Sequence, residues 1–268
     1  MDTKTSEPNL QLDYDVVVVG AGFAGIYALW KAKKMGYKVK GFERASDVGG
    51  TWFWNSYPGA RCDVESYNYA YFFDESIVRD WEWSDACAGQ EEIQRYLRFV
   101  ADRCAVLENI SFNTKIESVQ YVEASGLWHL SDSNDKRLTC RYPILAIGAL
   151  SEPKKPDIEG VEDFVGDTYF TSNWPRDNLV NFSGKRVGVI GTGSSGVQAI
   201  PEIAKTASEL YVFQRTANYV TPTRSGPMET ELVLSIKKDP KAWIKVDRML
   251  SSRQMPPRDS DQPSKNDR

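Results

Sequence analysis

The sequence predicts an α/β architecture in which two strand–helix–strand units follow one another along 268 residues. Two glycine-rich turns of the pattern G-x-G-x-x-G lie 171 residues apart, each after a short apolar run and before a segment of helical periodicity. The residue 23 positions after each first glycine is the acid Glu43 in one unit, and Gln214, followed by Arg215, in the other. These observations are typical of a Rossmann-like fold with two dinucleotide-binding units.

The first glycine turn has the residues that a phosphate-binding turn needs. Gly20 permits the sharp turn from strand to helix, Gly22 lets the backbone approach a pyrophosphate, and Gly25 lets the helix pack closely on the strand. The start of the helix then presents unpaired N–H groups and the positive end of its dipole. Glu43 can accept hydrogen bonds from ribose hydroxyls, which favours an adenine dinucleotide without a 2′-phosphate. The alternative is a structural turn that binds nothing.

The second turn, over 191–196, predicts a different nucleotide. Its second strand ends in Gln214 and not in an acid, and Arg215 can meet a 2′-phosphate, so this unit predicts NADPH. Pro201 is expected to interrupt the helix of this unit. The alternatives are again a structural turn, with Arg215 as an ordinary surface arginine.

The other predicted elements complete two modules. The apolar and turn patterns predict strands over 16–19 and 37–43 around a helix over 26–35, which ends at Gly36. A second helix is predicted over 91–104. Short antiparallel strands are predicted over 111–122, 127–131 and 137–141, and a buried strand over 143–148. A proline-containing connection over 151–160 precedes the second unit, whose apolar strand is expected at 187–190.

Composition excludes several classes of function. The net charge of −4 and the pI near 5.3 argue against nucleic-acid binding. The four cysteines show no C-x-x-C pair, and with a single histidine, His129 on a predicted strand, we expect no metal site. No apolar run is long enough to span a bilayer, and the polar N-terminus lacks a secretory pattern. We therefore expect a cytoplasmic protein with reduced thiols.

Several motifs together resemble one family, the class B flavoprotein monooxygenases, which include the Baeyer–Villiger monooxygenases. The resemblance extends over about 13–222 and is limited to the family's N-terminal half. It rests on both glycine turns, the Gly-Gly-Thr-Trp at 49–52, the Tyr-Pro-Gly-Ala-Arg-Cys-Asp at 57–63, the Ala-Ile-Gly at 146–148 and the Gln-Arg-Thr at 214–216. It implies a Rossmann-like flavoprotein with FAD at the first turn and NADPH at the second.

The resemblance also implies the site residues. Asp63 would be a flavin-side carboxylate with a catalytic role, although a turn cap is the alternative, and most of the neighbouring aromatic residues suit a core equally well. The implied FAD site comprises Gly20, Gly22, Phe23, Ala24, Gly25, Glu43, Arg44, Gly50, Thr51, Trp52, Asp63 and Tyr69. The implied NADPH site comprises Gly191, Gly193, Ser194, Ser195, Gly196, Arg215 and Thr216.

On this basis the chain divides into a flexible leader at 1–12, an FAD-binding domain at 13–150, a linker at 151–183, a partial NADPH-binding domain at 184–250 and a disordered tail at 251–268. The implied activity uses dioxygen to convert a ketone to an ester or lactone, or to oxygenate a heteroatom. The alternative is a catalytically silent or uncoupled NADPH-oxidising remnant that needs a partner chain.

Two departures from the family stand out. The family fingerprint F-x-G-x-x-x-H-x-x-x-W-P is present at 164–175 except for the histidine, which is Phe170 and can neither titrate nor donate a hydrogen bond. Members of the family are also longer than this chain, so we expect a truncated sheet whose apolar edge is covered by a partner chain or by self-association.

Overall fold

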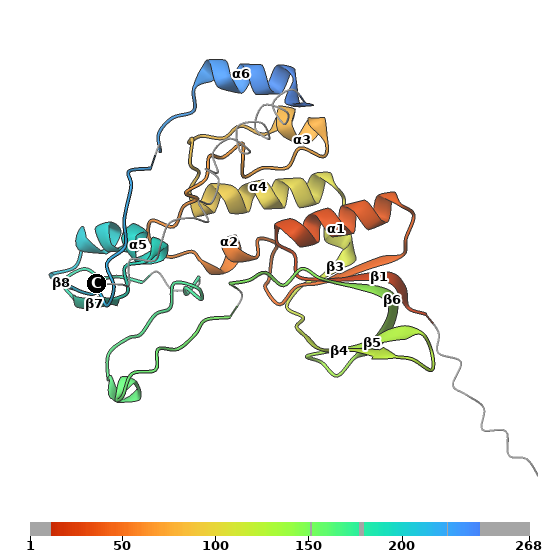
Figure 1. Ribbon diagram of the computed structural model, residues 1–268, viewed down its shortest axis with the longest axis horizontal. Coiled ribbons are helices and arrows are strands. Elements are labelled where there is room, and N and C mark those ends of the chain that lie inside the picture. Colours follow the sequence, from red (N-terminus) through yellow and green to blue (C-terminus); the bar gives the residue numbers. More distant parts are fainter. Residues whose placement is uncertain (1–11, 151, 177–179, 224, 242–268) are drawn as a thin grey trace, which may run out of the picture. The chain divides into compact units, whose positions relative to one another are not determined.

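The computed structural model describes residues 12–150, 152–176, 180–223 and 225–241 (Figure 1). The chain forms two compact units, Met1–Arg61 with Gly89–Pro222 and Cys62–Ala88 with Thr223–Arg268. The predicted leader, except Leu12, and the predicted tail lie outside the described residues. The division into FAD-binding and NADPH-binding domains stays a prediction, because compactness does not report which nucleotide a unit binds.

A six-stranded sheet forms the base of the first unit, in the order β3-β2-β1-β6-β5-β4. Strands β2 and β6 pair in parallel with β1, and β3 pairs in parallel with β2, whereas β4, β5 and the first part of β6 are antiparallel. Val16, Val17 and Val18 of β1 are buried, as the apolar run predicts. The strands are β1 Tyr14–Val19, β2 Val39–Phe42, β3 Ile110–Ser111, β4 Ile116–Val122, β5 Leu127–Asp132 and β6 Arg137–Leu145.

Helices α1 (Phe23–Lys34) and α4 (Gln90–Arg103) lie on the same side of this sheet (Figure 1). The helical periodicity of α4 is confirmed, since its buried face includes Ile93, Tyr96 and Leu97. Helix α1 begins three residues earlier than predicted, inside the glycine motif itself. The shorter helical elements of this unit are α2 (Thr51–Trp54), η1 (Leu107–Asn109) and η2 (Val161–Asp163).

Two predictions about strands were wrong. The segments 137–141 and 143–148 are not separate strands, because β6 is continuous and changes from antiparallel pairing with β5 to parallel pairing with β1. Its second half is not buried, with Leu145 56% exposed among the described residues. The predicted strand at 111–122 also divides, since Ser111 belongs to β3 at the far end of the sheet.

The second glycine turn lies between β7 (Arg186–Ile190) and α5 (Ser194–Ala204), and β8 (Glu209–Phe213) pairs in parallel with β7. Helix α5 continues through Pro201 to Ala204, so the predicted interruption was wrong. Proline removes one helical hydrogen bond, and its ring crowds the carbonyl four residues earlier. Burial of Ile203, on the same helix, against the β7–β8 sheet offsets this cost.

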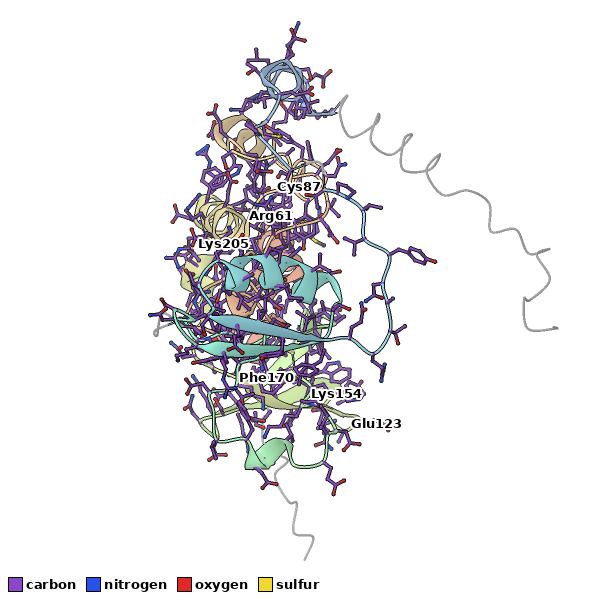
Figure 2. The ribbon with its side chains drawn as sticks, turned by 90° about the vertical axis from the view of Figure 1, so that its left-hand side faces the viewer. Arg61, Cys87, Glu123, Lys154, Phe170 and Lys205 are labelled. Atoms are coloured by element: carbon purple, nitrogen blue, oxygen red, sulfur yellow. The ribbon has the colours of Figure 1, made fainter. Side chains whose placement is uncertain are left out.

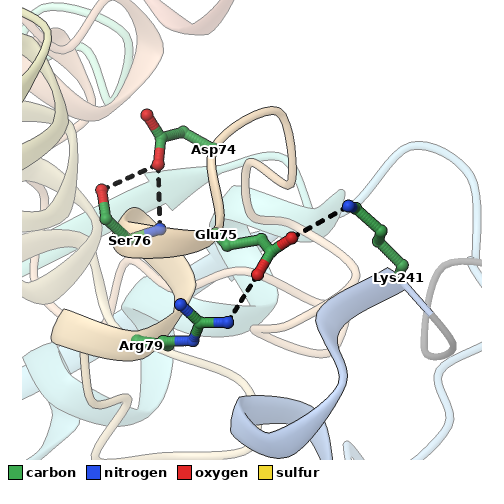
Figure 3. A network of polar contacts seen from close by, with 5 residues as sticks. All are labelled: Asp74, Glu75, Ser76, Arg79 and Lys241. Carbon is green, nitrogen blue, oxygen red and sulfur yellow. Dashed lines mark hydrogen bonds and ion pairs between the residues drawn. The ribbon is translucent and has the colours of Figure 1, made fainter.

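The second compact unit contains α3 (Glu75–Asp80) and α6 (Thr230–Lys238). Asp74 caps α3 by accepting hydrogen bonds from the backbone N–H and the hydroxyl of Ser76 (Figure 3). Glu75 pairs with Arg79 one turn later, at 2.5 Å, and with Lys241 just beyond α6, at 3.0 Å. Hydrogen bonding and the charge of Lys241, with that of Arg79, lower the pKa of the Glu75 carboxyl. These pairs join α3 to the end of α6.

Candidate functional site

Two positions of the first glycine turn, Gly20 and Gly25, fit only glycine. Gly20 has φ of +101°, a conformation that other residues rarely adopt, and its N–H donates to the Phe42 carbonyl at 2.8 Å. A Cβ at Gly25 would lie 1.9 Å from the Gly20 carbonyl oxygen, so a side chain there would push helix and turn apart. Gly22 caps α1, and the Ile26 N–H donates to its carbonyl at 3.0 Å. The three glycines therefore have the positions that the sequence predicts.

The first turn of α1 suits an anion. No side-chain hydrogen bond caps the helix and no acid lies in its first turn, and the first N–H groups of an α-helix have no acceptor within the helix. The helix dipole adds partial positive charge at the same place. Phe23 and Ala24 contribute backbone there, which is what their predicted contact with a pyrophosphate requires.

Glu43 is 5% exposed and holds the turn in place. Its Oε2 accepts a hydrogen bond from the Ala21 N–H at 2.7 Å, and its Oε1 accepts one from the Ala45 N–H at 2.9 Å. Because each carboxylate oxygen has two lone pairs, these bonds leave acceptor capacity for ribose hydroxyls. The neighbouring Arg44 pairs with Glu152 at 2.6 Å and lies over the Trp54 ring at 4.7 Å.

The Gly49–Gly50 turn lies against the first glycine turn. The Gly49 N–H donates to the Ala21 carbonyl at 3.0 Å, and a Cβ at Gly50 would lie 3.0 Å from the Gly22 Cα. The structure therefore brings Gly50 and the start of α2 to the predicted FAD site. Thr51 is exposed there, whereas Trp52 is buried.

Three contacts that the sequence did not reveal hold the carbonyl groups of α2. The Trp52 carbonyl accepts from the Gln90 side-chain amide on α4, and the Trp54 carbonyl accepts from the Trp174 N–H at 3.2 Å. Arg176 donates to the Phe53 carbonyl at 2.6 Å and stacks over the Phe53 ring at 4.3 Å. Such contacts join residues far apart in sequence, and no local pattern predicts them.

The second glycine turn repeats the first. Gly191 has φ of +98°, and its N–H donates to the Phe213 carbonyl at 2.9 Å. Gly193 caps α5 in the same extended conformation as Gly22, and a Cβ at Gly196 would lie 2.3 Å from the Gly191 carbonyl oxygen. A Cβ at Gly193 meets no atom within 4 Å in the described part of the chain. This helix start, with Ser194 and Ser195, is likewise open to an anion.

The end of β8 differs from the end of β2. Gln214 stands where the first unit has Glu43, and its side-chain amide donates to the Thr192 hydroxyl at 2.8 Å. Arg215 and Thr216 follow and are exposed. Within the residues that the structure describes, the Arg215 guanidinium makes no hydrogen bond and no ion pair. The cation is thus available beside the second turn.

Phe170, labelled in Figure 2, replaces the fingerprint histidine in the segment before β7. It forms a backbone bridge to Asn173, whose N–H donates to the Phe170 carbonyl at 3.0 Å. Trp174 of the same segment packs against Tyr169 and Phe182, with ring centroids 5.5 and 6.2 Å away. The segment therefore keeps its aromatic packing without a titratable side chain at position 170.

Asp63 and Tyr69 belong to the second compact unit, whereas the glycine turns belong to the first. Asp63 is exposed, and Tyr69 is half-buried. Burial raises the pKa of the adjacent Cys62 thiol, and the Asp63 carboxylate adds to this effect. The predicted roles of both residues at a flavin stay predictions.

Within its described part, the chain has no group of histidine, cysteine, aspartate and glutamate residues placed to hold a metal ion, and none of its helices has the length and apolarity for a membrane span. The Nε2 atom of His129, on β5, is buried and has no hydrogen-bond partner among the described residues.

Comparisons with known proteins agree on one group of enzymes. The family model for pyridine nucleotide-disulphide oxidoreductases matches residues 14–239. The 2-oxo-Δ3-4,5,5-trimethylcyclopentenylacetyl-CoA monooxygenase of Pseudomonas putida is 46% identical over 242 residues, which are 88% of this chain and 44% of the relative. Cyclohexanone 1,2-monooxygenase of an Acinetobacter species is 41% identical, over 85% of this chain and 42% of the relative.

Solved structures give the same result. A steroid monooxygenase bound to NADP superposes with a TM-score of 0.79 at 46% identity, over 84% of this chain and 43% of that one. OTEMO in complex with FAD and NADP superposes with a TM-score of 0.83 at 45% identity, over 88% and 45% of the two chains. The chain thus has the Rossmann-like fold of these monooxygenases and spans less than half the length of the curated relatives it matches.

Proposed function

Because this chain belongs to the pyridine nucleotide-disulphide oxidoreductase family, we propose that it binds FAD at the first glycine turn and NADPH at the second. One observation carries the proposal. The two turns have nearly the same backbone, but a buried acid, Glu43, adjoins the first and a free cation, Arg215, adjoins the second. That difference matches the absence and presence of a 2′-phosphate.

At the first site, the N–H groups of Phe23, Ala24 and Gly25 would hold the FAD pyrophosphate, with Gly20 and Gly22 leaving room for it. Glu43 would accept hydrogen bonds from the ribose, as its remaining lone pairs allow. Arg44, Gly50, Thr51 and Trp52 would also contact the FAD, with Gly50, Thr51 and Trp52 near the flavin or its linker. The roles of Asp63 as a flavin-side carboxylate and of Tyr69 as an FAD-binding residue stay predictions from the resemblance.

At the second site, the backbone from Gly193 to Gly196, including Ser194 and Ser195, would hold the NADPH pyrophosphate, while Gly191 makes the turn. Arg215 would pair with the 2′-phosphate, and the Thr216 hydroxyl can donate to the same group.

The reaction that this pair of sites supports best is a monooxygenation of Baeyer–Villiger type. NADPH supplies hydride, and FAD supplies the chemistry with dioxygen that protein side chains lack. This chain would bind and orient the two nucleotides and exclude water from them. The substrate class is a ketone, converted to an ester or lactone, or a nitrogen compound, in line with the names of the relatives. A sulfur compound is the further class that the family resemblance implies.

A second candidate is NADPH oxidation that releases hydrogen peroxide without oxygenating a substrate. Phe170 favours it, because a phenyl ring cannot take over a polar or titratable role of the family's histidine. A silent nucleotide-binding protein is the remaining alternative.

We also propose that further polypeptide, from a partner chain or a second copy, covers the β7–β8 sheet on the side away from α5. Ile190, Tyr211 and Phe213 on these strands are 66%, 53% and 58% exposed. Large exposed apolar side chains that lie together mark contact surfaces. A cytoplasmic location fits the four cysteines, all of which are free thiols.

Product analysis tests the function. The full chain, loaded with FAD, is incubated with NADPH in air and with a panel of cyclic ketones and sulfides. Esters, lactones or sulfoxides formed in proportion to the NADPH consumed support the monooxygenase. NADPH consumption matched by hydrogen peroxide alone supports the second candidate, and no consumption contradicts both.

A further inference from the structure

One side chain, that of Gln198 on α5, holds a segment that lies more than 130 residues earlier in the chain. Its amide Nε2 donates to the Arg61 carbonyl at 3.0 Å, and its Oε1 accepts from the Arg61 N–H at 3.3 Å. The same Oε1 accepts from the Tyr57 hydroxyl at 2.8 Å. A primary amide pairs with a backbone in this way only at one position and orientation, so the contact fixes the segment on α5.

The segment Tyr57–Arg61 is shaped for this helix. A Cβ at Gly59 would lie 2.4 Å from the Gln198 backbone carbonyl oxygen, so only glycine permits such close contact. Tyr57 and Ala60 are each 8% exposed and pack in one buried cluster with Ala199 and Ile203 of α5. Packing and hydrogen bonding therefore act together at this contact.

The contact lies between the two glycine turns. Gln198 follows Gly196, the last glycine of the second turn, by two residues on α5. Tyr57 follows the end of α2 at Trp54 by three residues, and Gly50, the N-cap of α2, lies against Gly22 of the first turn. The two turns are thus linked through Gln198 by two contacts, Gln198 with Tyr57–Arg61 and Gly50 with Gly22, and by the short stretches of chain between them.

We propose that Gln198 is a positioning residue that couples the two nucleotide sites, a proposal that rests on the proposed function. A nucleotide at the start of α5 holds that helix, the helix holds Tyr57–Arg61 through Gln198, and that segment holds α2 against the FAD turn. Since both nucleotides favour the same docked arrangement, each raises the affinity of the other. Such coupling is reciprocal by thermodynamic necessity.

The coupling is measured as the ratio of the FAD Kd without NADP⁺ to the FAD Kd with saturating NADP⁺, with the reverse titration as a check. NADP⁺ replaces NADPH so that no hydride transfer disturbs equilibrium. For the wild-type chain we expect a ratio of about 5 or more, the low end of allosteric couplings. Gln198→Met keeps the length of the side chain and removes all three hydrogen bonds, and should bring the ratio close to 1.

Two further variants complete the test. Gln198→Glu keeps the acceptor for Tyr57 and the Arg61 N–H but loses the donor, and its ratio should fall between those of Gln198→Met and the wild type. If Gln198→Met does not fold, the ratio measured for Gln198→Glu tests the proposal in its place. Lys205→Gln, at the other end of α5 and labelled in Figure 2, removes a lysine that pairs with Glu202 and should keep the wild-type ratio.

If the role of Gln198 is purely structural, the Gln198 variants should bind both nucleotides more weakly but keep the wild-type ratio of FAD Kd values. That result overturns the proposal. A wild-type ratio of 1 overturns it as well. Failure of the wild-type chain to bind FAD at all is seen in the first titration and overturns the proposed function together with the coupling.

Discussion

Gly22→Ala separates loss of FAD from loss of the fold. The backbone of Gly22, with φ of −82° and ψ of −164°, suits alanine, and the new Cβ would lie at an ordinary 3.4 Å from the Gly50 Cα. The free energy of unfolding of the Gly22→Ala apoprotein should therefore lie within about 1 kcal/mol of the wild-type value. The methyl group would instead occupy the space through which the turn approaches a pyrophosphate.

The size of the effect follows from the hydrogen bonds at stake. A bond from a backbone N–H to a charged phosphate contributes about 1.5–3 kcal/mol, so displacing one such bond raises the FAD Kd roughly 10- to 150-fold. Gly25→Ala should instead lower the stability of the apoprotein itself. Its Cβ would meet the Gly20 carbonyl oxygen at 1.9 Å, and such overpacking costs about 1–3 kcal/mol of apoprotein stability.

Urea unfolding of the apoprotein gives its free energy of unfolding. Titration of the apoprotein into FAD, followed by quenching of the flavin fluorescence, gives the FAD Kd. The matched control is Gly193→Ala, at the same place in the second turn. It should leave the FAD Kd unchanged and raise the Kd of NADP⁺. A Gly22→Ala chain that folds normally and binds FAD with the wild-type Kd would refute the assignment of the first turn to FAD.

Three other changes test separate parts of the account. Arg215→Ala should raise the Kd of NADPH about tenfold or more and leave that of NADH unchanged, because only NADPH has the 2′-phosphate; equal losses in the two titrations would contradict its role. Phe170→His should lower the hydrogen peroxide formed per NADPH consumed if the second candidate function results from the missing histidine, and an unchanged yield in a peroxide assay would remove that explanation. Lys237→Met should raise the pKa of the Glu82 carboxyl, which the Lys237 hydrogen bond and charge lower. The stabilising effect of that pair is present above the ordinary glutamate pKa and is lost as the pH falls through the lowered one. Carboxyl titration by NMR measures this shift, and an unchanged pKa would show that the ion pair does not form in solution.

The glycine turns were predictable because their determinants are local. An apolar strand, three glycines at fixed spacing and a helical repeat lie within about twenty residues, and the positive φ of Gly20 and of Gly191 is a conformation that glycine adopts readily. Glu43 and the Gln214–Arg215 pair at the ends of the second strands were predictable for the same reason, since Glu43 and Gln214 each lie 23 residues after the first glycine of their turn.

Long-range pairing was not predictable to the same degree. Strand β6 pairs with β5 in its first half and with β1 in its second, and nothing in the sequence of 137–145 marks the change. Pro201 was expected to interrupt its helix, but the helix continues, and Ile203 two residues further on is buried. The Tyr57–Arg61 motif was evident in the sequence, whereas its partner Gln198 was not, because their contact depends on the folded chain.

The central claim is that this chain holds a flavin and a nicotinamide nucleotide at its two glycine turns. The most direct measurement is the visible spectrum of the full chain after mixing with FAD and removal of free FAD, followed by NADPH without oxygen and then by air. The account predicts a yellow protein that NADPH bleaches and air restores. A protein that stays colourless after FAD treatment, or a bound flavin that NADPH does not reduce, would contradict it.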